Sequence, residues 1–314
     1  MTFRLRDNPD EVDGYADAVA QIAQIPRAHV EKDFWITEVL RGIAAASRET
    51  GCTVIFKGGT SLSKAFGLIK RFSEDVDLLV VLPDASKKAK NNVLKKFETH
   101  ARAATGLEGN IDPGTTTEGV KRTLHLDYPS THQHTGLRRS VLVEIGTRGG
   151  ALPYVRRPMQ SLIAEYAERA EFDGDFEEIA PISHLVLDPV RTLIEKLVIV
   201  HHAATEGDAE RQRVTARHFY DIDMLLGSGD VISDLAKQEV DLLVREVEQH
   251  SKAAGLPSIG RPADGFAASP AWNLRSDHVR QAYDDVITRL VWPNTEPSSF
   301  EACCQRVHEV ADLL

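Results

Sequence analysis

The chain of 314 residues has little cysteine, only Cys52 and the adjacent Cys303 and Cys304. These thiols lack the spacing of a metal-ligand set. The sequence also lacks a secretory signal segment and any apolar run near the ~20 residues that span a bilayer. We therefore expect a reduced, cytoplasmic protein with no membrane segment.

Positive charge is also scarce. The chain has 37 Lys and Arg against 47 Asp and Glu, a net charge of −10. This balance argues against a broadly basic nucleic-acid-binding surface, so any polyanion would have to bind local basic patches. A hydrophobic content of 42% and a charged content of 27% are ordinary for a globular protein. The length is sufficient for one large or two ordinary domains.

The most informative feature is a small-residue turn, Lys57-Gly58-Gly59-Thr60, followed by a strand that opens Ser73-Glu74-Asp75-Val76-Asp77. Glycine tolerates φ > 0 and carries no Cβ, so such a turn allows a close approach to a phosphate. Two aspartates at i and i+2 project from one strand face, roughly 6–7 Å apart. Most Asp-x-Asp pairs lie in turns or on surfaces, and a Gly-Gly pair can be a simple strand-to-helix turn. Here the strand is otherwise apolar, and buried charges persist when paired or metal-bound.

The first half of the chain is predicted to be α+β, with about four strands and flanking helices. Apolar periodicity and turn residues predict helices over 10–24, 28–47, 60–66 and 84–103, and strands over 52–56, 76–82, 124–128 and 141–145. Thr60 is predicted to cap its helix. We expect a first domain over residues 1–150.

The second domain, over residues 151–314, is expected to be mainly helical. Asp188-Pro189 is typical of a helix start, and helices are predicted over 189–204, 212–226, 232–253, 277–290 and 298–313. An acidic segment, 171–178, and a segment rich in Gly and Pro, 255–270, are predicted to be loops.

Three further charged residues are candidates for the same site. Glu144 is the only charge in an apolar strand; it is either an edge residue or a third carboxylate beside Asp75 and Asp77, enough for two metal ions. Lys196 leans toward an apolar helix face, where it either snorkels or reaches a phosphate. Asp221 also faces inward and could pair with Lys196 or contact a nucleotide.

Four histidines invite a metal interpretation, but none has a strong ligand spacing to a cysteine or carboxylate. They are His132, His134, His201 and His202. Packing or solvent-exposed histidines are the simpler interpretation.

The order of several motifs resembles the AbiEii/AbiGii family of nucleotidyltransferase toxins, within the polymerase-β-like superfamily. The similarity runs from about residue 28 to 226 and rests on Glu31-Lys32-Asp33-Phe34-Trp35, Phe56 to Lys64, Arg71 to Asp77, Tyr128-Pro129-Ser130, Val143-Glu144-Ile145, Glu195-Lys196-Leu197 and Arg217 to Asp221. It implies a mixed sheet flanked by helices, followed by a helical C-terminal region. One departure is His218, where many relatives have an aspartate.

The resemblance also implies roles for individual residues. Lys57, Gly58, Gly59, Thr60, Ser73 and Lys196 would bind the nucleotide, and Asp75, Asp77 and Glu144 would bind Mg²⁺. Lys196 and Asp221 match the last motif of the family, which is needed for activity, so the C-terminal domain would contribute to the site. The implied partners are an NTP, an RNA acceptor such as the 3′ end of tRNA, and a cognate antitoxin of a toxin–antitoxin or abortive-infection system.

The expected reaction is attack by a hydroxyl on the α-phosphorus of an NTP, with release of pyrophosphate. Basic residues that could offset the net charge and bind RNA, or be only solvated, are Lys87, Lys88, Lys90, Lys95, Lys96, Lys121, Arg122, Arg138 and Arg139. Two alternatives stay open. One transfers the nucleotide to a protein hydroxyl or to a small molecule such as an aminoglycoside, and the other is a non-catalytic binding protein on the same scaffold.

Overall fold

The computed structural model describes residues 3–82, 84–107, 109–112, 115–130, 137–169, 176–253, 259–272 and 277–314. His132 and His134 lie outside these ranges, as do parts of the two predicted loops. The chain divides into two compact units. Unit 1 comprises Met1–Ala65, Phe72–Arg148 and Tyr154–Val186, and unit 2 comprises Phe66–Arg71, Gly149–Pro153 and Leu187–Leu314.

This division differs from a single boundary at residue 150. Residues 154–186 group with the first unit because they carry two strands of its sheet. The short segment Phe66–Arg71 groups with the second unit although it lies early in the chain.

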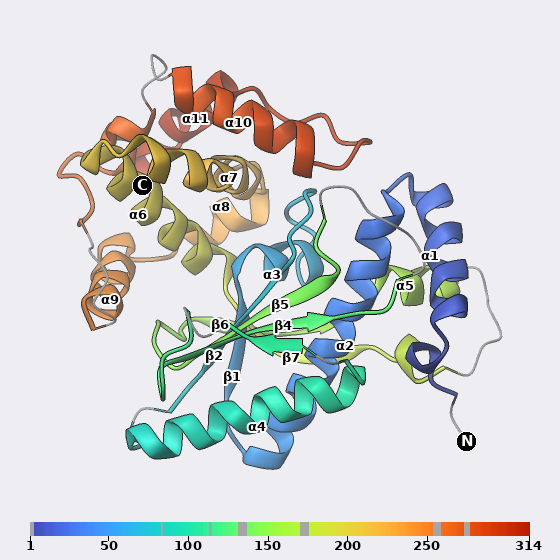
Figure 1. Ribbon diagram of the computed structural model, residues 1–314. Helices are drawn as coiled ribbons and strands as arrows, with labels where there is room; N and C mark the ends of the chain where they lie inside the picture. Colours follow the sequence, from blue (N-terminus) through green and yellow to red (C-terminus); the bar gives the residue numbers. More distant parts are fainter. Residues whose placement is uncertain are drawn as a thin grey trace. The chain divides into compact units, whose positions relative to one another are not determined.

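Unit 1 contains a mixed sheet with the strand order β3-β4-β5-β2-β1-β7-β6 (Figure 1). β1 pairs antiparallel with β2 and parallel with β7, and β2 pairs parallel with β5. β4 pairs antiparallel with both β3 and β5. The strands are β1 (Val54–Lys57), β2 (Asp75–Val80), β3 (Gly109–Ile111), β4 (Lys121–Asp127), β5 (Ser140–Gly146), β6 (Tyr154–Met159) and β7 (Ile182–Leu187).

Helices α1 to α5 belong to the same unit. Their bounds are α1 (Pro9–Ala23), α2 (Arg27–Thr50), α3 (Gly58–Lys64), α4 (Lys87–Thr105) and α5 (Leu162–Arg169). The predicted apolar stripe of α2 is buried. α2 and α4 pack against each other and against β5 (Figure 1). A Cβ at Gly42 of α2 would collide with the His100 carbonyl and with Ala104 of α4, so this glycine permits the close packing.

One local prediction in unit 1 is wrong. Thr60 does not cap α3, because the N-cap is Lys57 and Thr60 lies inside the helix. The strands β3, β6 and β7 were not anticipated. β7 pairs with β1, more than a hundred residues earlier in the chain, and a local sequence pattern does not indicate a partner at that distance.

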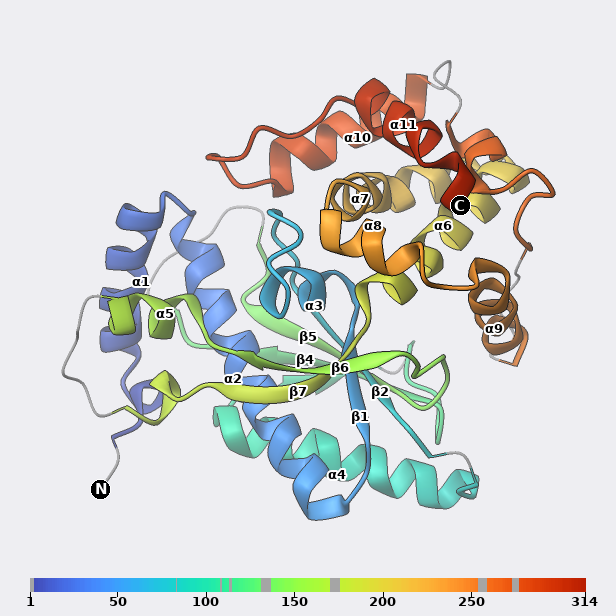
Figure 2. The same ribbon diagram turned by 180° about the vertical axis from the view of Figure 1, so that it is seen from behind.

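Unit 2 is mainly helical, with α6 (Pro189–Glu206), α7 (Ala209–Leu226), α8 (Gly229–Leu235), α9 (Val240–Ala253), α10 (Asp277–Leu290) and α11 (Phe300–Glu309), seen from the opposite side in Figure 2. The predicted start of α6 is confirmed, because the Asp188 side chain accepts a hydrogen bond from the Val190 N–H at 2.8 Å. The single helix expected over 232–253 is instead α8 and α9.

The core of unit 2 is built around α7, which packs against α6, α10 and α11. Phe219 of α7 contacts the rings of Trp272 and Phe300, and Phe300 contacts Tyr283 of α10. All four aromatic residues are buried. This cluster fixes α7, the helix that carries Asp221.

No helix in the described ranges is both long and apolar enough to cross a membrane.

Candidate functional site

Asp75 and Asp77 open β2 and point to the same face of the sheet in unit 1. Both are half-buried and alternate with the fully buried Val76, as expected for a strand with a two-residue repeat. From Leu78 to Val80 the strand is buried throughout. The two carboxylates therefore lie at the partly exposed start of a strand that is otherwise buried.

Gly58 approaches one of these carboxylates closely. It has φ +79°, and a Cβ at this position would collide with the Asp77 Oδ2 atom. In the strand register Asp77 faces Lys57, directly before Gly58. Only glycine satisfies both the backbone angle and the limited space, so the turn lies directly against the Asp-x-Asp strand. Its approach to a phosphate stays a prediction.

Thr60 and Ser73 lie at the same end of β2. The Thr60 hydroxyl donates a hydrogen bond to the Asp75 carbonyl at 2.5 Å, and its Oγ1 lies 3.0 Å from the Ser73 Oγ. Thr60 is buried. Its side chain therefore connects α3 to the start of the strand that carries both aspartates.

Glu144 is the strand neighbour of Asp77, one of the two alternatives that the sequence left open, because the two residues are partners in the parallel β2–β5 register. Its carboxylate also forms an ion pair with Lys121 of β4, with 2.7 Å between Oε1 and Nζ. Within the described ranges, no three His, Cys, Asp or Glu side chains are arranged to hold a metal ion. The site therefore contains two half-buried aspartates, and the third carboxylate beside them, Glu144, is paired with Lys121.

That arrangement suits Mg²⁺. Mg²⁺ is usually bound through one or two carboxylates, with water and substrate phosphates completing its octahedral shell. A cage of three protein carboxylates is therefore not required. The partial exposure of Asp75 and Asp77 leaves room for such additional ligands.

Two ion pairs from α2 brace the site, and sequence reasoning did not assign them. Asp33 accepts from the Lys64 Nζ at 2.6 Å, at the end of α3, and from the Leu162 N–H at 2.7 Å. Lys32 forms an ion pair with Glu74, the residue before Asp75. The sequence could have indicated these residues, because Lys32, Asp33 and Lys64 all lie within the motifs that resemble the family.

In unit 2, Asp221 lies at the centre of a buried ion-pair cluster. Arg71 donates to both of its carboxylate oxygens, from Nε to Oδ1 at 2.7 Å and from Nη2 to Oδ2 at 2.8 Å. Lys196 donates to Oδ2 at 2.7 Å, and its Nζ lies 3.2 Å from His218 Nδ1. The interpretation that Asp221 pairs with Lys196 is confirmed, and Arg71 is a partner that the sequence did not reveal.

The burial of this cluster changes the pKa values of its members. Burial opposes charge on Asp221, but Arg71 and Lys196 outweigh it and hold the pKa of Asp221 well below its usual range. Burial lowers the pKa of Lys196, and the Asp221 charge offsets part of this effect. Burial, together with the Lys196 charge, lowers the pKa of His218 well below its ordinary value. His218 is therefore neutral at physiological pH.

The basic residues considered for RNA binding and the histidine His201 have different surroundings. Arg122 is buried in an ion pair with Glu98, so it is not a surface residue for RNA. Lys88 and Lys95 are exposed on α4. The interpretation of His201 as a packing histidine agrees with its burial and with the 2.8 Å hydrogen bond between its Nδ1 and the Ser269 hydroxyl.

The sheet, the glycine turn and the Asp-x-Asp strand are the parts expected of a nucleotidyltransferase, and the chain belongs to that class. A family model described as "Nucleotidyl transferase AbiEii toxin, Type IV TA system" matches residues 39–303. The chain therefore belongs to the AbiEii family of nucleotidyltransferase toxins of type IV toxin–antitoxin systems.

Solved structures of two further proteins are similar. MenT4, the nucleotidyltransferase toxin Rv2826c from Mycobacterium tuberculosis H37Rv, is 19% identical, with a TM-score of 0.38, over 95% of this chain and 96% of that one. JHP933 from Helicobacter pylori is 17% identical, with a TM-score of 0.36, over 80% of this chain and 91% of that one. None of the curated proteins matches the chain.

Proposed function

We propose that this toxin transfers a nucleoside monophosphate from an NTP, with Mg²⁺, to the 3′ end of an RNA, with tRNA as the acceptor. The observation that carries this proposal is the contact between Gly58 and the half-buried Asp77 carboxylate. It brings a turn that can accommodate a phosphate to a carboxylate pair that can hold a cation. Lys57, Gly59, Thr60 and Ser73 complete the proposed nucleotide site.

Asp75 and Asp77 would hold Mg²⁺, with Glu144 as the third acidic residue. When bound, this ion neutralises charge on the triphosphate and orients it. The side chains of α2 support the carboxylates, because the Lys32–Glu74 and Asp33–Lys64 pairs fix the two segments on either side of the site. In the reaction a hydroxyl oxygen forms a bond to the α-phosphorus, the α–β phosphoanhydride bond breaks, and pyrophosphate leaves.

Lys196 is proposed to supply positive charge to the triphosphate, with Asp221 and Arg71 as its positioning residues. The ion pair of 2.7 Å between Lys196 and Asp221 supports the positioning role. Because electrostatic stabilisation is the largest contribution to such catalysis, a correctly placed ammonium group is valuable.

The choice of acceptor is inferred from the distribution of charge. Exposed Lys88 and Lys95 offer a basic patch for RNA. The net charge of −10 favours a second candidate, transfer to a protein hydroxyl or to a small molecule such as an aminoglycoside. The toxin family also implies an antitoxin as a partner.

A labelling experiment separates these acceptors. The protein is incubated with Mg²⁺ and each of the four NTPs, labelled at the α-phosphate, together with total tRNA, lysate protein or an aminoglycoside. We expect label in tRNA with at least one nucleotide. Label in protein or aminoglycoside alone would establish the second candidate instead, and no transfer to any acceptor would contradict both.

The control variants are Asp77→Asn and Asp127→Asn. Asp127 is an exposed residue at the end of β4, so its substitution makes the same chemical change away from the site. Transfer should be lost with Asp77→Asn and retained with Asp127→Asn. Equal transfer by both variants would exclude Asp77 from the reaction.

A further inference from the structure

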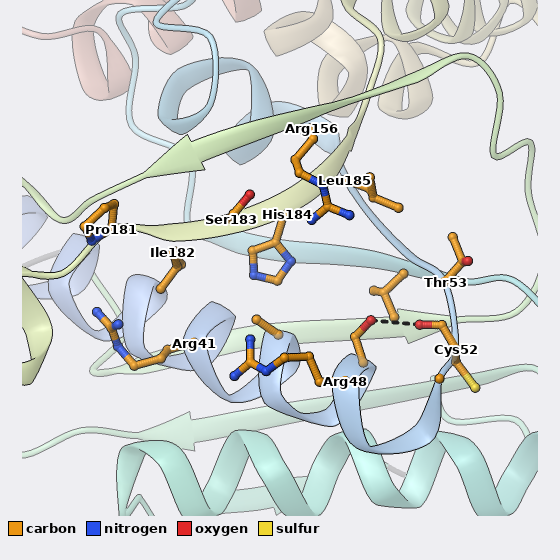
Figure 3. Close-up of a pocket in the computed structure, with 14 residues that line it drawn as sticks. Arg41, Arg48, Cys52, Thr53, Arg156, Pro181, Ile182, Ser183, His184 and Leu185 are labelled. Carbon is orange, nitrogen blue, oxygen red and sulfur yellow. Dashed lines mark hydrogen bonds between the residues drawn. The ribbon is translucent and has the colours of Figure 1, made fainter.

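A cavity in unit 1 lies at the opposite end of β1 from the proposed catalytic residues. Its volume is about 690 Å³, and it is formed by the C-terminal half of α2, the start of β1, and residues of β6 and β7 (Figure 3). Val54 lines the cavity, whereas Lys57 leads into the Gly-Gly turn. At about 3.3 Å per residue, roughly 10 Å of strand separates the two ends.

The lining of this cavity is basic. It includes Arg41, Arg48 and Arg156, and none of the fourteen residues that line it is acidic. This composition is unusual in a chain whose net charge is −10. A concave surface with one sign of charge concentrates the field and attracts the opposite charge.

Two of the three arginines are available to a ligand. Arg41 is engaged, because it pairs with Glu38 and donates to the carbonyls of Glu178 and Ala180. Arg48 and Arg156 are exposed, and neither pairs with a carboxylate in the described part of the chain. Figure 3 shows their guanidinium groups directed from α2 and β6 toward the space beside the His184 ring.

His184 forms the floor between these arginines. Its Nε2 lies 2.8 Å from the Leu40 carbonyl oxygen, and the residue is buried. Burial, together with the charges of Arg156 and Arg48, lowers the pKa of His184 to about 4, although the hydrogen bond with the Leu40 carbonyl partly opposes this shift. The ring is therefore neutral at physiological pH, and the two guanidinium charges are close enough to act on it.

The other walls combine hydroxyl groups with apolar surface. Thr53 and Ser183 supply hydroxyls, and Ile182 and Leu185 supply apolar side chains. The volume falls in the range of small-molecule sites, which combine apolar walls with a few polar groups. Guanidinium groups recognise phosphate through paired hydrogen bonds.

We propose that this cavity binds a small phosphorylated molecule of nucleotide size, with Arg48 and Arg156 as its phosphate ligands. This site is separate from the proposed catalytic carboxylates, and it does not depend on which acceptor the toxin modifies. A phosphate between the two guanidinium groups would relieve their mutual repulsion, and the apolar wall would contact the remainder of the molecule.

The test measures ADP binding by calorimetry in EDTA, which removes the cation that the carboxylate site would need. The double variant Arg48→Gln/Arg156→Gln should bind ADP at least about tenfold more weakly, since hydrogen bonds between charged groups contribute that much each. The matched control Arg169→Gln/Arg213→Gln removes the same charge from two exposed positions outside the cavity and should bind as the wild type does. Asp77→Asn should also leave this binding unchanged.

Several outcomes would overturn the proposal. These are unchanged binding by the cavity variant, equal weakening of both double variants, or equal weakening by Asp77→Asn, which would place ADP at the catalytic carboxylates. A cavity variant that loses tRNA binding but keeps ADP binding would assign the arginines to RNA instead. Because all four substituted arginines are exposed, both double variants should fold, and thermal melting verifies this.

A second measurement does not depend on substitutions. Binding of ADP should shift the His184 ring resonance in a proton–carbon NMR spectrum of the wild-type protein, because the ring lies between the two arginines. Saturating ADP that leaves this resonance unchanged would contradict the proposal.

Discussion

Unit 1 and unit 2 both contain aspartates that the sequence singled out, but the two settings differ. Asp75 and Asp77 are half-buried, and the missing Cβ of Gly58 lets the Asp77 carboxylate lie close to the glycine backbone. Asp221 is fully buried, and both of its oxygens accept hydrogen bonds from cationic side chains. A carboxylate neutralised inside the fold is suited to hold other side chains in place, whereas a partly exposed pair is suited to bind a ligand.

The strongest test of this difference is Asp77→Asn. We expect nucleotidyl transfer to fall by about a thousandfold, because the charge that holds a cation is removed. The midpoint of urea unfolding should stay near that of the wild type, since the residue is half-buried and the change is nearly isosteric. A large loss of stability together with the loss of transfer would mean that Asp77 resembles Asp221 after all.

Asp221→Ala should have the opposite profile. It leaves Arg71 and Lys196 buried without their shared carboxylate, which costs about 3–5 kcal/mol of unfolding free energy. Urea denaturation measures this loss. Asp230→Ala, in the first turn of α8, is the matched control and should change stability little. If Asp221→Ala is as stable as this control, the cluster does not support unit 2.

The acid stability of unit 1 provides a third test, through His184. Its pKa is about 4 in the folded protein against an ordinary value of 6.5, so only the unfolded chain takes up this proton between those values. The contribution of His184 to stability should therefore be constant above pH 6.5 and should fall by about 3 kcal/mol as the pH drops to 4. In His184→Gln this contribution to the pH dependence should disappear, whereas His308→Gln, on an exposed position of α11, should retain it. A pH dependence identical in both variants would contradict the assignment.

Gly58→Ala should lower transfer less than Asp77→Asn does, with a small loss of stability. The positive φ should cost about 1 kcal/mol, and the added Cβ should displace the Asp77 carboxylate and lower transfer by at least about tenfold. Gly51→Ala is the matched control, because Gly51 has φ +67° with open space around it. It should show the same loss of stability with full activity. Equal activity of the two variants would show that the Gly58–Asp77 contact is dispensable.

Much of the fold near these sites could be predicted from the sequence. The stripe of α2, the apolar run of β2, the Asp188-Pro189 start of α6 and the bounds of α10 are local patterns, and the structure confirms them. The sequence offered the position of Glu144 beside Asp77 as one of two alternatives, and the strand register shows that these residues are partners.

The remainder depends on contacts between distant residues. Arg71 and Asp221 are 150 positions apart, and nothing in either local pattern indicates that they meet. Thr60 follows a Gly-Gly turn as a capping residue would, yet its hydroxyl bonds to the Asp75 carbonyl instead. The cavity beside His184 was missed for the same reason, because Arg48 of α2 and Arg156 of β6 lie far apart in the chain and meet only in the fold.

The chain passes repeatedly between the two units, and this has a consequence for dissecting the protein. Because Phe66–Arg71 belongs to unit 2 and lies between two segments of unit 1, no single cut releases either unit whole. A fragment ending at residue 186 would retain Arg71 without Asp221, and the complementary fragment would retain Asp221 without Arg71. Each fragment expressed alone would therefore lack a partner for a buried charge, and joint expression of both fragments could restore it.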